Sequence, residues 1–183
     1  MDEFRIIIQR FVLNKMTAAD GDKYFRLSNN PAVMKFVTGY ALNREESDEM
    51  LEGFLIENRS NTYFGRYLIE DFKTGELIGA AKLDKFGSEI EIGYRIQEEH
   101  WGKGIATEIA SGLINFSKNT LRAKKVIAFV NVNNKASIRV LEKAGMENVE
   151  TIEDIDEVKF KFSLSSQPDS ALKKLLNVVF RLK

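Results

Sequence analysis

The sequence predicts an α/β (α+β) domain with a mixed, largely antiparallel central sheet flanked by helices. Three observations predict it. The first quarter of the chain has mainly helical patterns, residues 62–96 change to the period of two that is typical of strands, and residues 105–164 alternate between helix and strand. With 183 residues, the chain has the length of one ordinary domain, which we place at residues 1–164.

The N-terminal segment is predicted to contain one strand and three helices. Residues 5–13 have the β-branched and aromatic content of a strand. A Thr-Ala-Ala-Asp run at residues 17–20 has the spacing of a capping box, which favours a helix through Leu27. The Asn-Pro pair at residues 30–31 can open a short helix, and Asn43 precedes a longer run with apolar residues at helical spacing.

Residues 62–96 are predicted to form three antiparallel strands, because apolar runs of period two are separated by glycine-containing turns. The runs are at 67–69, 77–78 and 90–94, and the turns are at 73–75 and 86–88. Beyond them, apolar spacing predicts a helix, a buried strand, a second helix that ends at Gly145, and a closing hairpin. These elements cover residues 105–116, 126–132, 136–144 and 150–164.

Residues 165–183 are predicted to be a short linker followed by an amphipathic helix. Apolar residues alternate with lysines from Leu172 to Leu182. We expect this helix to pack on its own domain or on a second copy of the chain, so a homodimer is compatible with the sequence. Its basic and apolar character also allows a helix that lies on a membrane surface.

Composition argues against several classes of protein. Lys and Arg number 27, as do Asp and Glu, so the net charge is zero and neither disorder nor nucleic-acid binding is favoured. The absence of cysteine excludes disulfides and a thiolate nucleophile, and the single histidine, His100, excludes a multi-histidine metal site. Charged residues interrupt the apolar N-terminus, so we predict no signal peptide or transmembrane segment and expect a cytoplasmic protein.

A glycine turn joins the strand at 89–96 to the helix that begins near Ile105. The turn is Gly102-Lys103-Gly104. The first amide groups of a helix have no internal acceptor, and glycines let a pyrophosphate approach the backbone, so the turn could bind a diphosphate. Gly-x-Gly alone more often marks a plain turn. Thr107 replaces the third glycine of a dinucleotide fingerprint, and a Walker lysine-serine pair is missing, which argues against nucleotide readings.

Gly93 lies inside a predicted strand, where glycine usually marks a bulge or a close approach by another backbone. A bulge there could part this strand from the strand at 126–132. The freed amide groups could then pair with an extended ligand, so the gap would be a binding slot.

Three runs of sequence resemble the GNAT superfamily of acetyl-CoA-dependent N-acetyltransferases, and within it the RimJ/RimL-like branch that acetylates ribosomal-protein N-termini. They are residues 91–94 (Glu-Ile-Gly-Tyr), 100–108 (His-Trp-Gly-Lys-Gly-Ile-Ala-Thr-Glu) and 133–146 (from Asn-Asn-Lys-Ala-Ser to Ala-Gly-Met). The resemblance spans residues 5–164 and implies the acyl-CoA N-acyltransferase fold.

The resemblance also implies acetyl-CoA as co-substrate, with no metal. Backbone groups around Ile96 and Gln97 would pair with the pantetheine arm, and Asn134 would contact it. The pyrophosphate would lie on the turn formed by Trp101, Gly102, Lys103, Gly104, Ile105 and Ala106. The family usually has Gln or Arg where this chain has Glu99, so the contacts to phosphate would come from the backbone.

Family chemistry is direct attack of a neutral amine on the thioester, which requires a base and a means of releasing the thiolate. Glu91 is the leading candidate for the base, acting through water, and Glu89 on the same strand face is the alternate; either could instead be a solvated carboxylate. Leu141 occupies the position of the family's usual acid, a tyrosine. Ser137 could hydrogen-bond the sulfur or simply satisfy the helix backbone. We expect His100 to be a surface or packing residue.

The predicted function is transfer of acetyl from acetyl-CoA to a primary amine, either a protein N-terminal α-amine or a small amine such as a polyamine or aminoglycoside. Loops at 36–43 and 59–64 are expected to border the acceptor site. Because of Leu141 and Glu99, a catalytically silent acyl-CoA-binding domain is the alternative. A structural domain without a ligand is a third reading.

Overall fold

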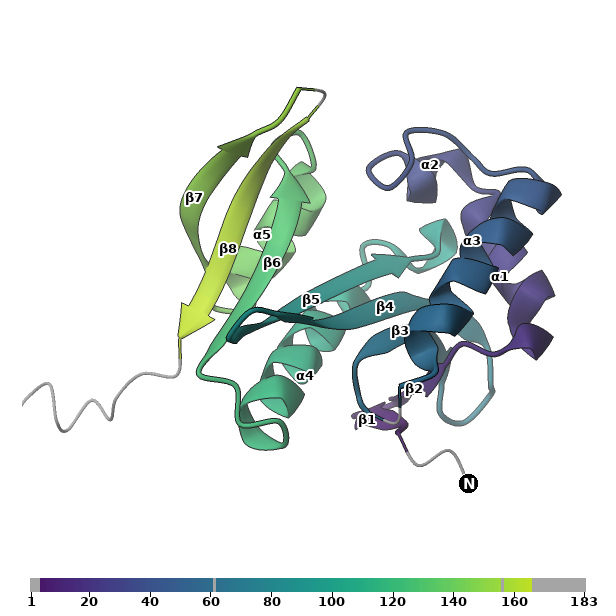
Figure 1. Ribbon diagram of the computed structural model, residues 1–183, viewed down its shortest axis with the longest axis horizontal. Helices are drawn as coiled ribbons and strands as arrows, with labels where there is room; N and C mark the ends of the chain where they lie inside the picture. Colours follow the sequence, from purple (N-terminus) through teal and green to yellow (C-terminus); the bar gives the residue numbers. More distant parts are fainter. Residues whose placement is uncertain (1–3, 61, 156, 166–183) are drawn as a thin grey trace, which may run out of the picture.

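An eight-stranded sheet runs through the molecule in the order β1-β2-β3-β4-β5-β6-β8-β7 (Figure 1). The computed structural model describes residues 4–60, 62–155 and 157–165. The strands are β1 (Ile6–Ile8), β2 (Phe11–Lys15), β3 (Gly65–Asp71), β4 (Leu77–Phe86), β5 (Glu89–Ile96), β6 (Lys125–Asn131), β7 (Glu147–Glu153) and β8 (Val158–Ser165). Among these strands, β5 and β6 are parallel and all other neighbours are antiparallel. The predicted mixed, largely antiparallel sheet is confirmed.

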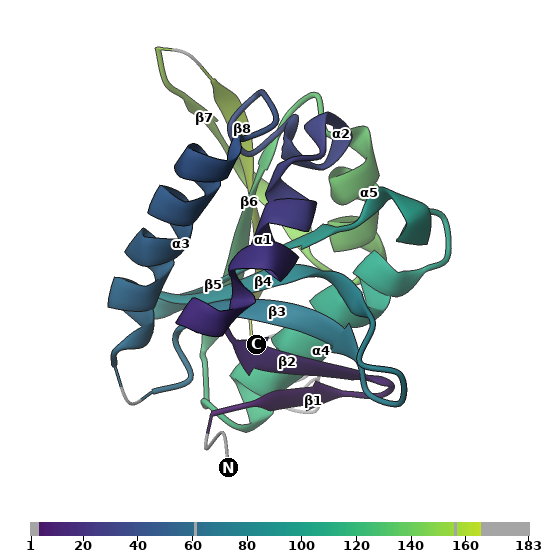
Figure 2. The ribbon, with the colours of Figure 1, turned by 90° about the vertical axis from the view of Figure 1, so that its right-hand side faces the viewer.

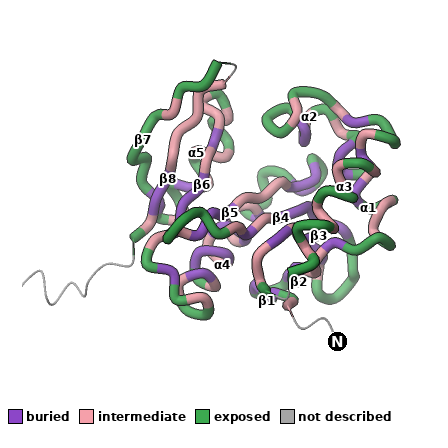
Figure 3. Tube along the Cα trace, viewed as in Figure 1, coloured by how far each residue is buried: buried purple, intermediate pink, exposed green. Residues whose placement is uncertain are grey.

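Helices cover both faces of the sheet. They are α1 (Gly21–Ser28), α2 (Pro31–Met34), α3 (Arg44–Asn58), α4 (Ile105–Asn119) and α5 (Lys135–Lys143), with short 3-10 turns at Ala18–Asp20 and Glu98–His100. Figures 1 and 2 show α1 and α3 on the side of the sheet opposite α4. The outer strand β7 is exposed along most of its length (Figure 3).

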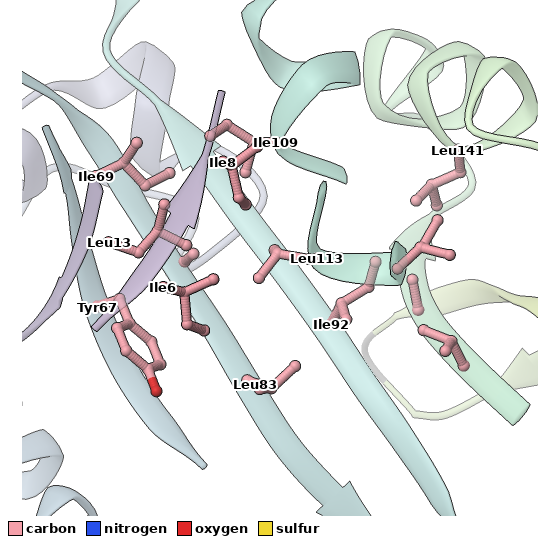
Figure 4. Close-up of a cluster of buried hydrophobic side chains, with 14 of the residues drawn as sticks. Ile6, Ile8, Leu13, Tyr67, Ile69, Leu83, Ile92, Ile109, Leu113 and Leu141 are labelled. Carbon is pink, nitrogen blue, oxygen red and sulfur yellow. The ribbon is translucent and has the colours of Figure 1, made fainter. Parts of the chain in front are cut away.

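Two apolar clusters hold these layers together. The larger lies between the sheet and α4, where Ile109 and Leu113 pack among strand residues such as Ile92 (Figure 4). The smaller lies between the sheet and helices α1 and α3. Side chains of β3 alternate between the two clusters. Tyr67 and Ile69 face α4 and belong to the larger cluster, whereas Leu68 faces α1 and α3 and belongs to the smaller one. Each fully buried aliphatic side chain contributes about 1.5–3 kcal/mol.

The first predicted element is wrong in detail. Residues 5–13 were expected to be one strand, but the segment turns back on itself after Ile8 and forms the β1–β2 hairpin, with Ile8 opposite Phe11. Gln9 adopts the left-handed conformation at φ 48° to make the turn. Glutamine is not a typical residue for that conformation, so the sequence carries no glycine or asparagine signal for the turn.

The other elements predicted within the described residues are present, although several of their ends are shifted. The Thr17 amide donates to the Asp20 carboxylate at 2.8 Å, as a capping box requires. The three-stranded meander forms as predicted by β3, β4 and β5. Gly145 follows α5 with φ 85°, and the next amide, of Met146, donates to the Leu141 carbonyl at 3.0 Å. The closing hairpin is β7–β8.

Strands β5 and β6 separate soon after they meet. Their pairing consists of Ile90 with Val126 and Glu91 with Ile127, after which the strands diverge (Figure 1). The predicted bulge at Gly93 is wrong, because the β4–β5 register runs without interruption past this residue. The predicted gap is nevertheless present, since it comes from the divergence of the two strands.

The expected linker and C-terminal helix lie outside the described residues, apart from Ser165. That residue ends β8. The division at residue 164 therefore stays a prediction. In the part of the chain that is described, no helix combines the length and apolar character needed to cross a bilayer.

Candidate active site

A cleft of about 1190 Å³ opens where β5 and β6 diverge. Its walls come from both of these strands, from α5, from the start of α4, and from α3 with the loop after α2. The cleft is thus continuous from the glycine turn to α3, which lies on the opposite side of the sheet. The volume exceeds that of a typical small-ligand pocket.

The edge of β5 presents free backbone groups to this cleft. The Gln97 amide donates to the Ile78 carbonyl of β4 at 2.9 Å. Hydrogen-bonding direction alternates along an antiparallel strand, so the amides of Tyr94 and Ile96, beyond the last β5–β6 pair, face away from β4, toward the gap. Because β6 leaves after Glu91, the gap can accept an extended ligand with amide groups.

Of the two backbone positions predicted to pair with pantetheine, only Ile96 therefore directs its amide into the gap. The Gln97 amide is already bonded to β4. The Ile96 carbonyl accepts from Trp101 Nε1 at 2.8 Å, so the indole anchors the glycine turn to the end of β5. The Trp101 side chain is otherwise half exposed.

The glycine turn forms an open cradle at the N-terminus of α4. Gly102 and Gly104 have φ angles of 73° and 78°, which other residues rarely adopt, and a Cβ on either would meet no atom within 4 Å. Gly104 is the N-cap, and no side chain caps the helix. The amides of the first turn therefore have no internal acceptor, and together with the helix dipole they suit a phosphate. Lys103 is exposed beside them.

Asn134 begins α5 on the opposite wall. Its Oδ1 accepts from the Ser137 amide at 3.1 Å, so the side chain caps the helix. Both residues line the cleft. The side-chain amide group of Asn134 remains as a donor to a ligand.

Glu91 lines the cleft, and its side chain is 12% exposed. It forms an ion pair with Lys82 of β4. Lys82 Nζ is also 3.4 Å from the Asp84 carboxylate, and Arg66 contacts the same carboxylate at 2.5 Å and Glu57 at 3.0 Å. These five side chains form a row of alternating charge, with three carboxylates and two cations.

Glu89, the alternate base, is held elsewhere. Its carboxylate lies 2.7 Å from Lys125 Nζ and 3.0 Å from Lys161 Nζ. The hydrogen bond from Lys125 is the main cause that holds the pKa of Glu89 below its ordinary value, with a smaller contribution from Lys161 and with burial opposing both. Glu89 does not line the cleft, so the structure brings only Glu91 to it.

Tyr94 also lines the cleft. It belongs to the sequence motif at residues 91–94, but the motif predicted no role for its side chain. Its hydroxyl is buried, with no hydrogen-bond partner among the described residues. Burial raises the pKa of Tyr94 to about 12, and the nearby Ser137 hydroxyl, which makes no well-aligned hydrogen bond to it, offsets part of the rise. Alternation along β5 could have placed it on the face opposite Glu91.

Leu141 and His100 also line the cleft. Leu141 is 2% exposed and belongs to the larger apolar cluster. The side chain of His100 is buried, with Nε2 3.5 Å from the Glu76 carboxylate and no hydrogen bond to it. The packing role expected for His100 agrees with this burial, although the expected surface position does not.

The side of the cleft near α3 is largely apolar. Met50 and Phe54 of α3 line it, and Phe36 and Val37 from the loop after α2 stand half exposed at its rim. Of the two loops expected to border an acceptor site, the one at 36–43 therefore reaches the cleft. Residues described within the loop at 59–64 do not line it.

A family match and similar structures agree with this geometry. Residues 10–147 match the family described as the acetyltransferase (GNAT) domain. The chain belongs to this acetyltransferase family. The protein YkkB of Bacillus subtilis (strain 168) is 31% identical over 153 residues, which cover 81% of this chain and 88% of that protein.

Solved structures show the same fold. An acetyltransferase (GNAT family) from Bacillus anthracis has a TM-score of 0.76 at 19% identity and covers 88% of this chain and 98% of its own. A spermidine N-acetyltransferase from Vibrio cholerae, in complex with CoA and spermine, has a TM-score of 0.68 at 20% identity and covers 85% and 95%. The described residues contain no group of three or more His, Cys, Asp or Glu placed to hold a metal ion.

Proposed function

We propose that this chain is an N-acetyltransferase that transfers the acetyl group of acetyl-CoA directly to a primary amine. The observation that carries the proposal is the continuity between the gap beside β5 and the uncapped start of α4. An extended arm with amide groups fits the first, and a pyrophosphate fits the second. Acetyl-CoA has both parts in that order.

In this account the backbone binds most of the donor. The free amides of Tyr94 and Ile96 in β5 pair with the pantetheine arm, and the turn from Gly102 to Ala106 binds the pyrophosphate. Asn134 donates its side-chain amide to the arm from the other wall. Glu99 contributes no cation to the phosphates, so the charge is balanced by the helix N-terminus and Lys103.

Glu91 is the proposed base. The amine enters from the apolar side near α3 and loses a proton to Glu91 through water, its nitrogen forms a bond to the acetyl carbon, and the C–S bond breaks. Lys82 holds the carboxylate in place.

For the acceptor we propose a protein N-terminal α-amine or a small amine. The RimJ/RimL-like motifs in residues 91–94, 100–108 and 133–146 favour the first. The structural likeness to a spermidine N-acetyltransferase is consistent with the second. The apolar side of the cleft, formed by Phe36, Val37 and α3, would contact the apolar part of either kind of acceptor.

A transfer assay tests the proposal. The protein is incubated with acetyl-CoA and, separately, a peptide with a free N-terminus, the same peptide blocked at its N-terminus, spermidine and an aminoglycoside. Release of free CoA thiol and the mass of each acceptor are measured. We expect one class of amine to be acetylated, and Glu91→Gln to slow the transfer by on the order of 10²–10⁴-fold.

Two other results of these experiments would favour a different function. If CoA raises the melting temperature but no amine is acetylated, the chain is a silent acyl-CoA-binding domain. That reading is motivated by Leu141 and Glu99. If CoA leaves the melting temperature unchanged at saturating concentration, the chain is a structural domain, and the proposal fails at its first step.

A further inference from the structure

The buried hydroxyl of Tyr94 has no well-placed hydrogen-bond partner in the part of the chain that the structure describes. The side chain packs against the larger apolar cluster, yet the residue lines the cleft, and its oxygen makes no well-aligned hydrogen bond within the described residues. A buried hydroxyl without a partner destabilises the fold, because it has lost its hydrogen bonds to water without replacing them. Phenylalanine would fill the same apolar space without that cost, so the hydroxyl points to a ligand atom that completes its hydrogen bonding.

The position of Tyr94 identifies the part of the ligand that it can reach. Tyr94 follows Glu91 by three residues on β5, beyond the point where β6 leaves the sheet. Strand side chains alternate, so Glu91 faces the helices α1 and α3 while Tyr94 faces α4 and α5. The two side chains therefore reach the cleft from opposite faces of the same strand, on either side of the gap.

The α5 wall supplies little else to a leaving group at this place. Leu141 is apolar and buried, so it donates no proton or hydrogen bond. Ser137 lies one turn before Leu141 and beside the Tyr94 hydroxyl. The two hydroxyl groups, one from β5 and one from α5, thus lie beside each other at the wall of the gap in which the donor is proposed to lie.

We propose that the Tyr94 hydroxyl donates a hydrogen bond to the sulfur of the acyl donor and stabilises the thiolate as it leaves. The inference rests on the proposed function, since it assigns a further catalytic residue to that reaction. Tyr94 is a different residue, on a different element, from the helix position occupied by Leu141.

The step balances without a further reactant. The amine nitrogen forms the bond to the acetyl carbon and loses its proton to Glu91, while the C–S electron pair passes to sulfur. The raised pKa of Tyr94, about 12, keeps its hydroxyl protonated at neutral pH. It therefore acts as a hydrogen-bond donor rather than a proton donor, and the thiolate takes a proton from water after release.

Binding of CoA and of desulfo-CoA, which lacks the sulfur atom, tests this contact without an acceptor. Titration calorimetry from pH 7 to pH 9.5 gives the ratio of the two affinities. We expect wild-type protein to prefer CoA increasingly as its thiol ionises, since a bond to a charged group strengthens binding by on the order of tenfold to hundredfold. Tyr94→Phe should remove most of that preference and leave the affinity for desulfo-CoA unchanged.

Tyr67→Phe is the matched control. Tyr67 is also buried, but its hydroxyl donates to the Tyr63 carbonyl and lies outside the cleft. That variant should lose stability and keep the CoA preference of the wild type. Tyr94→Phe should keep or raise the melting temperature, because it removes an unpaired hydroxyl, whereas a merely structural role for Tyr94 would lower it.

The results separate the role of Tyr94 from the binding of the donor. If wild type and Tyr94→Phe show the same ratio of CoA to desulfo-CoA affinity across the pH range, the role of Tyr94 is overturned while donor binding stands. If neither compound binds the wild type, the proposed function fails, and the Tyr94 proposal fails with it. With an acceptor from the transfer assay, Tyr94→Phe should lower kcat at least tenfold with the KM for acetyl-CoA within about twofold.

Discussion

Lys82 crosses over Gly93 to form its ion pair with Glu91. In the β4–β5 register Lys82 is directly opposite Gly93, and a Cβ on Gly93 would stand 2.8 Å from Lys82 Cγ and 2.9 Å from Cε. The glycine therefore serves the close approach of a side chain, one of the two meanings of a glycine within a strand. Lys82 therefore packs its stem on Gly93 and places its ammonium group against Glu91, the proposed base.

Replacement of Gly93 by alanine tests this relationship. The new methyl group would displace the Lys82 stem, so we expect the ion pair with Glu91 to break and kcat to fall by about tenfold or more. Gly53→Ala in α3 is the control, because nothing lies within 4 Å of its Cβ position. It should stabilise the protein by about 0.5–1 kcal/mol and leave kcat unchanged. Full turnover by Gly93→Ala would show that the lysine contact is dispensable.

Glu91 and Glu89 should give opposite results when each is changed to glutamine. Glu91→Gln should lower kcat strongly with little change in the KM for acetyl-CoA, since the carboxylate faces the acceptor side. Glu89→Gln should keep kcat but lower the melting temperature at neutral pH, since it loses the contacts to Lys125 and Lys161. Comparable loss of kcat in both variants would contradict the assignment.

The Glu89 effect should depend on pH. Lys125 holds the pKa of Glu89 below its ordinary value of 4.5, so the ionised carboxylate stabilises the fold above that pH. The contribution is lost as the pH falls through the lowered pKa of the folded state. The difference in melting temperature between wild type and Glu89→Gln should therefore be constant near neutrality and shrink below about pH 4.5. A difference that grows on acidification would have the wrong sign.

The glycine turn can be tested with two positions of equal backbone strain. Gly102 and Gly75 have φ angles of 73° and 71°, and neither Cβ position has a neighbour within 4 Å. Alanine at either should cost about 1–2 kcal/mol of stability. Only Gly102→Ala should also weaken CoA binding in calorimetry, and Gly102→Glu should weaken it further through charge repulsion. Equal CoA affinities in the two alanine variants would remove the turn from the donor site.

Two substitutions of Asn134 separate its cap from its proposed contact. Asn134→Asp keeps the oxygen that accepts from the Ser137 amide, so the melting temperature should be maintained, but it removes the donor to the pantetheine arm. Asn134→Ala removes both and should cost about 1 kcal/mol in addition. We expect weaker CoA binding in both variants. Wild-type affinity in Asn134→Asp would leave Asn134 with the capping role alone.

Much of the fold follows from local patterns. Period-two runs between glycine turns predicted the meander, and caps at Asn43 and Gly145 predicted helix ends, because these signals depend on neighbours in sequence. The β1–β2 hairpin was missed because Gln9 forms a left-handed turn without a turn-forming residue. Its conformation is imposed by the pairing of the two strands and the packing of their apolar side chains.

The site was predicted less completely, because long-range neighbours decide it. Alternation places Glu89 and Glu91 on one face and cannot distinguish them. The lysines at 125 and 161 do so, and they come from β6 and β8. Likewise Tyr94 could be placed on the opposite face from sequence, but the lack of a partner for its hydroxyl depends on how α5 packs beside β5.

A crystal structure of the protein with CoA and an amine acceptor from the transfer assay would show the proposed donor and acceptor sites together. We predict pantetheine in the gap along β5 between Ile92 and Ile96, pyrophosphate on the amides of Gly102 to Ala106, and the amine on the Glu91 side of the thiol. CoA bound outside the gap, or an amine on the α5 side of the strand, would contradict this prediction.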